Sequence, residues 1–152
     1  MTGCTNPASV KWLRENFLPH SSKKSFPKKI LIRRSGKTRG IANFDELETA
    51  LKERGWSVLD LEGLSFSDQI ALFAGASHIV AEHGAALTNL LWCRPGCQVL
   101  ELCAENFLNG CYEGISLCGN LRYSFLVFPA DSKNRFSVSL ETITKWVEAA
   151  RE

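Results

Sequence analysis

Five short apolar runs recur along the chain, each followed by a stretch of helical or polar character. The clearest is Ile79-Val80-Ala81, which is too short for a helix and is rich in β-branched residues. Runs of the same kind lie within residues 29–34, 56–61, 98–102 and 123–128. Apolar side chains throughout the middle of a run are typical of a parallel strand that is buried on both faces. The pattern therefore predicts five strands in a mainly parallel sheet.

Helices are predicted between and around these strands, because apolar residues recur there at helical spacing. Asn6 followed by Pro7 is typical of a cap and a first helical turn. The expected helices are a leading one over about Pro7–Phe17, one between the cap Asn43 and Gly55, one from Ser65, one over Ala85–Trp92, a weak one over Glu105–Leu117 and a closing one over Leu140–Ala150. This alternation predicts a doubly wound α/β fold, with a mainly parallel five-stranded sheet and helices on both faces, as in Rossmann-like domains.

Length and composition restrict the class of protein. The 152 residues are expected to form one α/β domain, with residues 1–28 as a leading helix and connector and residues 29–152 as the core. A net charge of +2 provides no general attraction for polyanions, so no nucleic-acid partner is expected. No apolar run approaches the roughly 20 residues of a membrane helix, and no signal-peptide pattern is visible. As written, the chain is expected in the cytoplasm, or in the secretory-pathway lumen if it is part of a longer protein.

Six cysteines lie at positions 4, 93, 97, 103, 111 and 118. A chain of this length can build its own core, so it does not depend on disulfides as very small secreted domains do. No paired cysteines or histidines with zinc spacing follow Cys93 and Cys97. Buried free thiols are therefore the favoured interpretation, ahead of disulfides or a metal site.

Basic and glycine residues gather where the predicted strands end. In parallel α/β sheets, ligands bind beyond the carboxyl ends of the strands. Arg33 and Arg34 end the first strand, and Lys37 and Arg39 follow in the next loop. Guanidinium groups bind phosphate oxygens in pairs of hydrogen bonds. These cations predict an anion site at this edge of the sheet.

The turn Glu82-His83-Gly84 leads from the third strand into a predicted helix. Free N–H groups and the positive end of the helix dipole favour anions at such a helix start, where Gly84 and Ala85 lie. Gly84 also lets a ligand approach the backbone closely, and His83 is expected to bring an imidazole to the rim.

Glu101 lies in the apolar fourth strand, where a buried carboxylate requires a partner. It could accept hydrogen bonds from sugar hydroxyls, as acidic residues do for ribose in dinucleotide-binding folds. Together, the strand ends predict a site for a phosphorylated ligand that carries hydroxyl groups, such as a nucleotide sugar. Taken singly, arginines after a strand are often only solvated, and a lone histidine at a turn is more often structural.

Several classes of site are disfavoured by missing motifs. The glycine-rich dinucleotide fingerprint, the Walker phosphate loop and the G-x-S-x-G elbow are all absent. No Asp-x-Asp pair is available to hold a divalent ion against a sugar diphosphate. We therefore expect no metal and no cofactor, and stabilisation of the leaving group by cationic side chains.

These motifs together resemble family 61 glycosyltransferases over about residues 29–126. The resemblance rests on Arg33-Arg34 after a strand, Arg39 with Asn43 four residues later, Gln69 in a helix led by serine, the segment His83-Gly84-Ala85-Ala86-Leu87-Thr88-Asn89, and Val99-Leu100-Glu101-Leu102. It implies a two-domain GT-B architecture, an inverting mechanism, and a metal-independent donor site in the C-terminal domain. The chain departs from the family pattern at Asn43-Phe44, and the acceptor-binding half is missing from it.

The resemblance also implies roles for individual residues. Arg33, Arg34 and Arg39 would hold the diphosphate of a donor that we expect to be a UDP-sugar. Gly84 and Ala85 would add backbone donors, and Asn89 belongs to the same motif. Glu101 would accept from ribose hydroxyls, and His83 would act catalytically by polarising a phosphate or sugar oxygen.

The sequence leaves three hypotheses open. In the first, the chain is the donor-binding domain of a transferase that works with an acceptor-binding domain or partner chain. Alternatively, it is a stand-alone nucleotide-binding module without transferase activity of its own. The third hypothesis is a degenerate remnant that folds but binds nothing.

Overall fold

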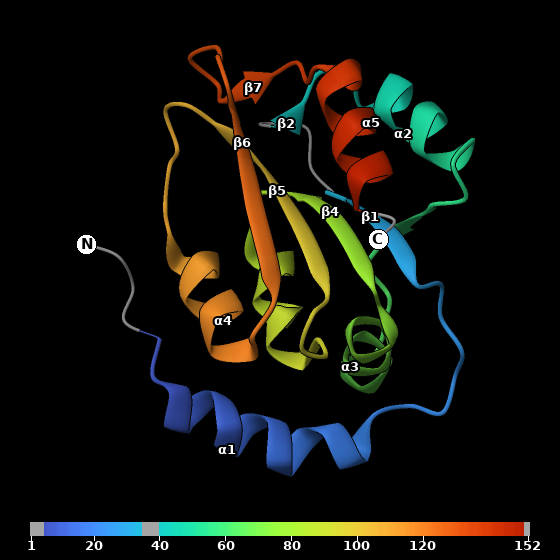
Figure 1. The fold of residues 1–152 in the computed structure, drawn as a ribbon, viewed down its shortest axis with the longest axis vertical. Coiled ribbons are helices and arrows are strands. Elements are labelled where there is room, and N and C mark those ends of the chain that lie inside the picture. Colours follow the sequence, from blue (N-terminus) through green and yellow to red (C-terminus); the bar gives the residue numbers. More distant parts are fainter. Residues whose placement is uncertain (1–4, 35–39, 151–152) are drawn as a thin grey trace.

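A five-stranded parallel sheet lies at the centre of the computed structural model, which describes residues 5–34 and 40–150 (Figure 1). The strands are β1 (Lys29–Arg33), β3 (Ser57–Asp60), β4 (His78–Glu82), β5 (Gln98–Ala104) and β6 (Arg122–Phe128). They lie in the order β3-β1-β4-β5-β6, and every neighbouring pair is parallel. The predicted fold class is confirmed.

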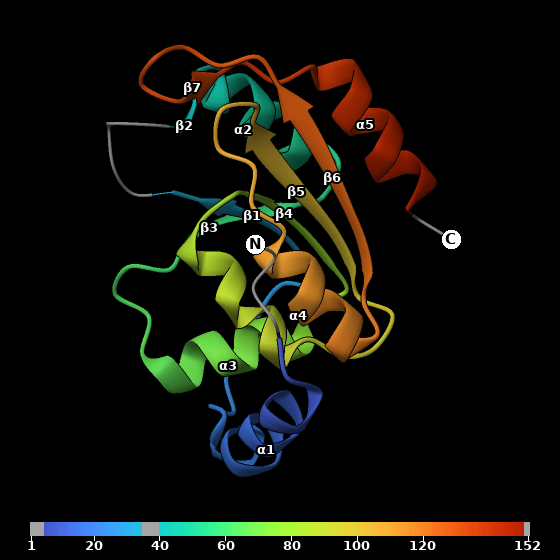
Figure 2. The same ribbon diagram turned by 90° about the vertical axis from the view of Figure 1, so that its left-hand side faces the viewer.

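Helices cover both faces of the sheet (Figure 2). One face packs against α2 (Phe44–Lys52) and α5 (Leu140–Ala149). The other packs against α3 (Phe66–Gly75), the 3-10 helix η2 (Ala85–Trp92) and α4 (Cys111–Gly119). Helix α1 (Pro7–Phe17), followed by the 3-10 turn η1 (Leu18–His20), lies outside this second layer.

The alternation of side chains along β1 explains why it is apolar throughout. Ile30 and Ile32 belong to the core under α3 and η2, whereas Leu31 belongs to the core under α2 and α5. Successive residues of a strand point to opposite faces, so a strand covered on both sides has no polar face. All three side chains are almost completely buried.

One of the two predicted helix caps is present. The Asn6 side chain accepts a hydrogen bond from the N–H of Ala8 at 2.9 Å, and α1 covers the predicted residues. The helix predicted from Ser65 is α3, and the Ser65 side chain caps it by accepting from the N–H of Asp68 at 3.2 Å. The second predicted cap, Asn43, does not cap its helix with its side chain. Asn43 precedes α2, but its side chain bonds both the N–H and the carbonyl of Val138, at 2.9 and 3.1 Å.

Three other details differ from the prediction. Strand β5 continues to Ala104, so Glu101 lies inside the strand and not at its end. The segment Ala85–Trp92 is a 3-10 helix, and the weakly helical stretch becomes α4 only from Cys111. A small parallel pair, β2 (Gly40–Ile41) with β7 (Arg135–Phe136), was not predicted.

Five cysteines of the described residues are free thiols, at positions 93, 97, 103, 111 and 118. Cys4 lies outside the described residues. The neighbouring Cys97 thiol and burial together raise the pKa of Cys93 well above its ordinary value, so the thiol is protonated at neutral pH. Within the described ranges, none of the helices combines the length and apolar character of a membrane span.

Candidate functional site

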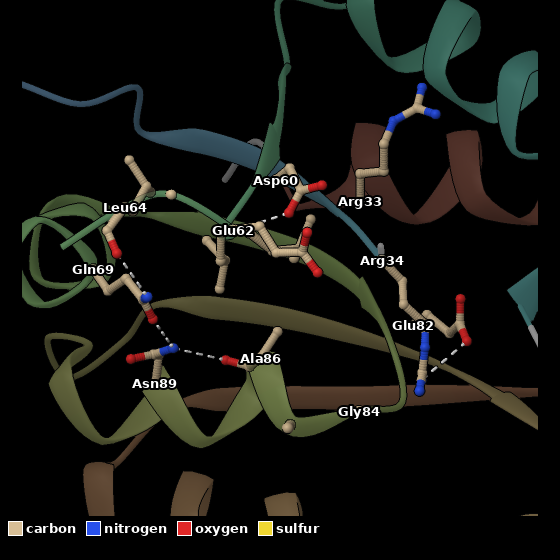
Figure 3. A pocket seen from close by; sticks show the side chains of 14 residues that line it. Arg33, Arg34, Asp60, Glu62, Leu64, Gln69, Glu82, Gly84, Ala86 and Asn89 are labelled. Atoms are coloured by element: carbon tan, nitrogen blue, oxygen red, sulfur yellow. Dashed lines mark hydrogen bonds and ion pairs between the residues drawn. The ribbon is translucent and has the colours of Figure 1, made fainter. Parts of the chain in front are cut away.

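A pocket of about 570 Å³ opens at the carboxyl ends of β1, β3 and β4 (Figure 3). After β1 the chain winds outward to β3, and it then crosses back over β1 to form β4. The sheet therefore changes winding direction between β1 and β4, and parallel α/β sheets bind ligands at such a switch point. The volume lies within the range of small-molecule sites.

Arg33 and Arg34 both line this pocket, but their side chains point to opposite sides of the strand end (Figure 3). Arg33 is bonded to Glu48 of α2, and its guanidinium carbon lies 4.5 Å from the centre of the Phe44 ring. Arg34 lies against the turn after β4, with Nη1 3.4 Å from Glu82 Oε1 and 3.1 Å from the His83 carbonyl oxygen. Arg34 is thus the guanidinium beside Gly84 and the start of η2.

Gly84 allows this close approach. Its φ of 172° is ordinary extended backbone, so the turn itself does not require glycine. A Cβ at this position, however, would lie 3.0 Å from Arg34 Nη1. The next residues, Ala85 and Ala86, also line the pocket and begin η2. The first N–H groups of a 3-10 helix have no acceptor within the helix, so they remain available to an anion.

Three carboxylates line the pocket, on Asp60, Glu62 and Glu82. Asp60 ends β3, and its Oδ1 accepts from the N–H of Glu62 at 2.8 Å. The sequence analysis did not predict these acids as site residues. An acid after the strand beside β1 is where dinucleotide-binding folds hold a ribose. The described lining thus carries two guanidinium groups and three carboxylates. One of these carboxylates, on Glu82, is the anionic neighbour of Arg34.

Asn89 lies at the side of the pocket formed by η2 and α3 (Figure 3). Its amide nitrogen donates to Gln69 Oε1 at 3.1 Å and to the Ala86 carbonyl at 3.2 Å. Its oxygen accepts from Trp92 Nε1 at 3.1 Å, and Gln69 donates in turn to the Leu64 carbonyl at 3.2 Å. Protein partners thus engage both ends of the Asn89 amide, which ties the two helices together. Its predicted role in binding ligand stays a prediction.

His83 and Glu101 lie outside the lining of this pocket. The expected position of His83 at the rim is wrong: the residue is 8% exposed, and its ring packs against those of Phe107 and Tyr112. Glu101 is completely buried, and its two oxygens accept from His83 Nδ1 and from the Tyr123 hydroxyl. The expectation that this carboxylate requires a partner is confirmed, but no sugar hydroxyl reaches it without a rearrangement.

Among the described residues, one group brings three possible metal-ligand atoms within 4.8 Å of one another: His83, Glu101 and Cys103. Burial and the negative charge of Glu101 raise the pKa of Cys103 to about 12, so the thiol is protonated at neutral pH. The carboxylate is already engaged by two hydrogen bonds. We interpret the group as a hydrogen-bonded cluster.

The remaining predicted cation, Arg39, lies outside the described residues, as does Lys37. The structure therefore brings together Arg33, Arg34, Gly84, Ala85 and Asn89 around one pocket. It brings His83 and Glu101 together at a separate place, beneath α4.

A parallel sheet with a polar pocket at its switch point defines a class of α/β proteins that bind small ligands there. Comparison with models of protein families shows which family within that class the chain belongs to. The model described as Glycosyltransferase 61 matches residues 2–100, about two-thirds of the chain. The chain belongs to the glycosyltransferase 61 family, which supports a glycosyltransferase function and suggests a nucleotide-sugar donor. The match includes every described residue that lines the pocket. Comparison with curated proteins gives no match.

Proposed function

We propose that this chain is the donor-binding domain of an inverting, metal-independent glycosyltransferase, with a UDP-sugar as the donor. The observation that supports this most is the pocket at the β1/β4 switch point, where Arg34, Gly84 and the first N–H groups of η2 meet. Family membership supplies the reaction class. A pocket of about 570 Å³ is large enough for a nucleoside diphosphate.

The diphosphate would lie between Arg34 and the start of η2. Arg34 now contacts Glu82, and a phosphate oxygen would become its second anionic partner or replace the carboxylate. Charge-assisted hydrogen bonds from the guanidinium and from the backbone would neutralise the diphosphate as the sugar departs. Arg33 lies at the rim, where Glu48 holds it, so its contribution is expected to be smaller.

The ribose would lie toward the β3 side of the pocket, against Asp60 and Glu62. Their carboxylates can accept hydrogen bonds on that side of β1, and the ribose hydroxyl groups would donate them. This assignment replaces Glu101, whose oxygens have partners within the protein core.

Metal independence is part of the proposal. Asp60, Glu62 and Glu82 line the same pocket, yet none of them belongs to the group of three possible metal ligands found among the described residues. The guanidinium of Arg34 and the N–H groups of η2 would supply the positive charge instead. In an inverting transfer, a base must deprotonate the acceptor hydroxyl, and we propose that an acceptor-binding domain or partner chain supplies it.

A thermal-shift screen tests the proposal. The full chain is heated with UDP, GDP or CMP, and with the matching nucleosides. One diphosphate, UDP by our proposal, should raise the melting temperature well above the effect of its nucleoside. Ligand at a hundredfold excess over its dissociation constant stabilises the native state by about 2.7 kcal/mol.

Two other results are informative. Equal shifts from nucleoside and nucleotide would contradict a diphosphate site. Stabilisation by UDP, without sugar transfer when an acceptor domain is supplied, would instead identify a stand-alone nucleotide-binding module.

A further inference from the structure

We propose that Tyr123, Glu101 and His83 form a hydrogen-bonded relay that positions Arg34, and that none of the three contacts the ligand. The relay rests on the proposed function, because it gives these residues a role in the same diphosphate site. It assigns Glu101 a role other than ribose binding, and His83 a role other than catalysis. A continuous series of contacts leads from β6 to the pocket.

The first contact of the relay is made within the sheet. Glu101 on β5 and Tyr123 on β6 lie under α4, on the same face of the sheet. The Tyr123 hydroxyl donates to one oxygen of Glu101, and the carboxylate is completely buried. A buried carboxylate with one such donor still has a second oxygen to satisfy.

His83 satisfies the second oxygen through Nδ1. Because a carboxylate only accepts, the contact fixes the proton of a neutral imidazole on Nδ1. The ring also packs against Phe107 and Tyr112, with ring centroids 5.3 and 5.2 Å away. Three side chains thus contact the His83 ring.

The backbone of His83 connects the restrained ring to the pocket. Its N–H donates to the Leu102 carbonyl of β5 at 2.9 Å. Its own carbonyl accepts from Arg34 Nη1 at 3.1 Å. Fixing the ring therefore fixes the carbonyl that orients Arg34 beside Gly84. Small displacements of a group that binds a charge can cost a large part of its effect.

Two substitutions at Glu101 separate positioning from direct contact. Glu101→Leu removes the acceptor and leaves His83 Nδ1 without a partner. Glu101→Gln keeps an amide oxygen that accepts from the same N–H, but removes the charge. In calorimetric titrations, E101L should bind UDP roughly tenfold more weakly than the parent, with uridine affinity unchanged. E101Q should bind both within about twofold of the parent. A ribose contact at Glu101 predicts loss for uridine as well.

A double-mutant cycle with Arg34→Ala tests the path of the effect. If Glu101 acts through Arg34, then E101L adds nothing to the UDP loss in R34A, whereas independent sites add. Additive losses, or a tenfold loss in E101Q, would overturn the relay. Should E101L not fold, Tyr123→Phe serves in its place, with an expected loss for UDP of about threefold.

A readout without ligand keeps the relay and the proposed function separate. In nitrogen-15 NMR of the full chain, the side-chain signals of Arg34 should shift in E101L and stay in place in E101Q. The His83 signals of the parent should show the proton on Nδ1. Unchanged Arg34 signals in E101L would overturn the relay. By contrast, R34A that binds UDP like the parent would overturn the proposed function, whatever the NMR result.

Discussion

Two adjacent arginines have different partners because they end a strand. Residues of β1 alternate between the two faces of the sheet, so Arg33 continues the side of Leu31 and Arg34 the side of Ile32. Arg33 therefore meets Glu48 and Phe44 of α2, whereas Arg34 meets the turn before η2. If the end of β1 at Arg33 had been known, the same alternation would have predicted different partners for the two arginines.

The contact between Gly84 and Arg34 gives the first prediction at this scale. In Gly84→Ala the new Cβ would lie 3.0 Å from Arg34 Nη1, so the guanidinium must move. Stability should change little, because the extended φ of 172° suits alanine. Affinity for UDP should fall by roughly three- to tenfold, measured by calorimetry.

The matched control is Gly75→Ala at the end of α3, where a Cβ meets nothing within 4 Å. It should leave UDP affinity unchanged. If G84A binds UDP as tightly as G75A does, the close approach of Arg34 to the turn has no role in binding.

At the scale of elements, one ion pair fastens the connector after α1 to helix α3. Lys24 Nζ lies 2.8 Å from Asp68 Oδ2, and the N–H of Ser22 donates to the Ser67 carbonyl at 3.0 Å. The hydrogen bond from Lys24, then one from Ser22, lowers the pKa of Asp68 below its ordinary value of 3.8. The folded chain therefore prefers Asp68 ionised.

This preference makes the stability contributed by Asp68 depend on pH. A carboxyl with a lowered folded pKa contributes stability above its unfolded pKa, and the contribution is lost as pH falls through the folded value. Asp68→Asn should therefore be less stable than the parent near neutral pH. The difference should close on acidification through and below pH 3.8.

Urea unfolding of both proteins at several pH values measures this difference. Glu53→Gln, at an exposed acid after α2, is the control for replacing a carboxylate by an amide. A difference between D68N and the parent that stays constant with pH would show that the ionised carboxylate is not what holds the connector.

Most elements could be predicted because their signals are local. Each buried parallel strand is a continuous apolar run, and Asn6 and Ser65 lie next to the helices they cap. The β2–β7 pair could not be found this way, since it joins Gly40–Ile41 to Arg135–Phe136, far apart in the chain. The role of the Asn43 side chain was predicted wrongly for the same reason, because its partner, Val138, is also far away in the chain.

The candidate site was predictable as far as it depends on strand ends. The sequence indicates that Arg34 and Gly84 meet, because parallel strands bring their carboxyl ends to one edge. It cannot indicate that Glu101 turns inward to His83 and Tyr123, since that depends on where β5 ends and how β6 is aligned with it. The acids of the pocket were not predicted because Asp60, the last residue of β3, and Glu62, in the turn after it, belong to no sequence motif.

At the scale of the whole molecule, the order of the strands creates the pocket. The chain winds from β1 to β3 in one direction and from β4 to β6 in the other. The winding direction therefore changes between β1 and β4, and the pocket lies at this switch point. α3 and η2 then form one side of the pocket, and the turn after β3 forms another (Figure 3). We propose that this pocket holds a diphosphate through Arg34 and without a metal.

Calorimetric titration of three proteins with UDP and uridine, each with and without EDTA, tests that claim most directly. The proteins are the parent, Arg34→Ala, and Arg94→Ala, an exposed arginine before β5 at the opposite edge of the sheet. Loss of a charge-assisted contact of about 1.5–3 kcal/mol should weaken UDP binding in R34A by roughly ten- to a hundredfold. Uridine binding, the R94A control and the chelator series should match the parent. If R34A binds UDP as the parent does, or if EDTA abolishes binding, the metal-free diphosphate site is contradicted.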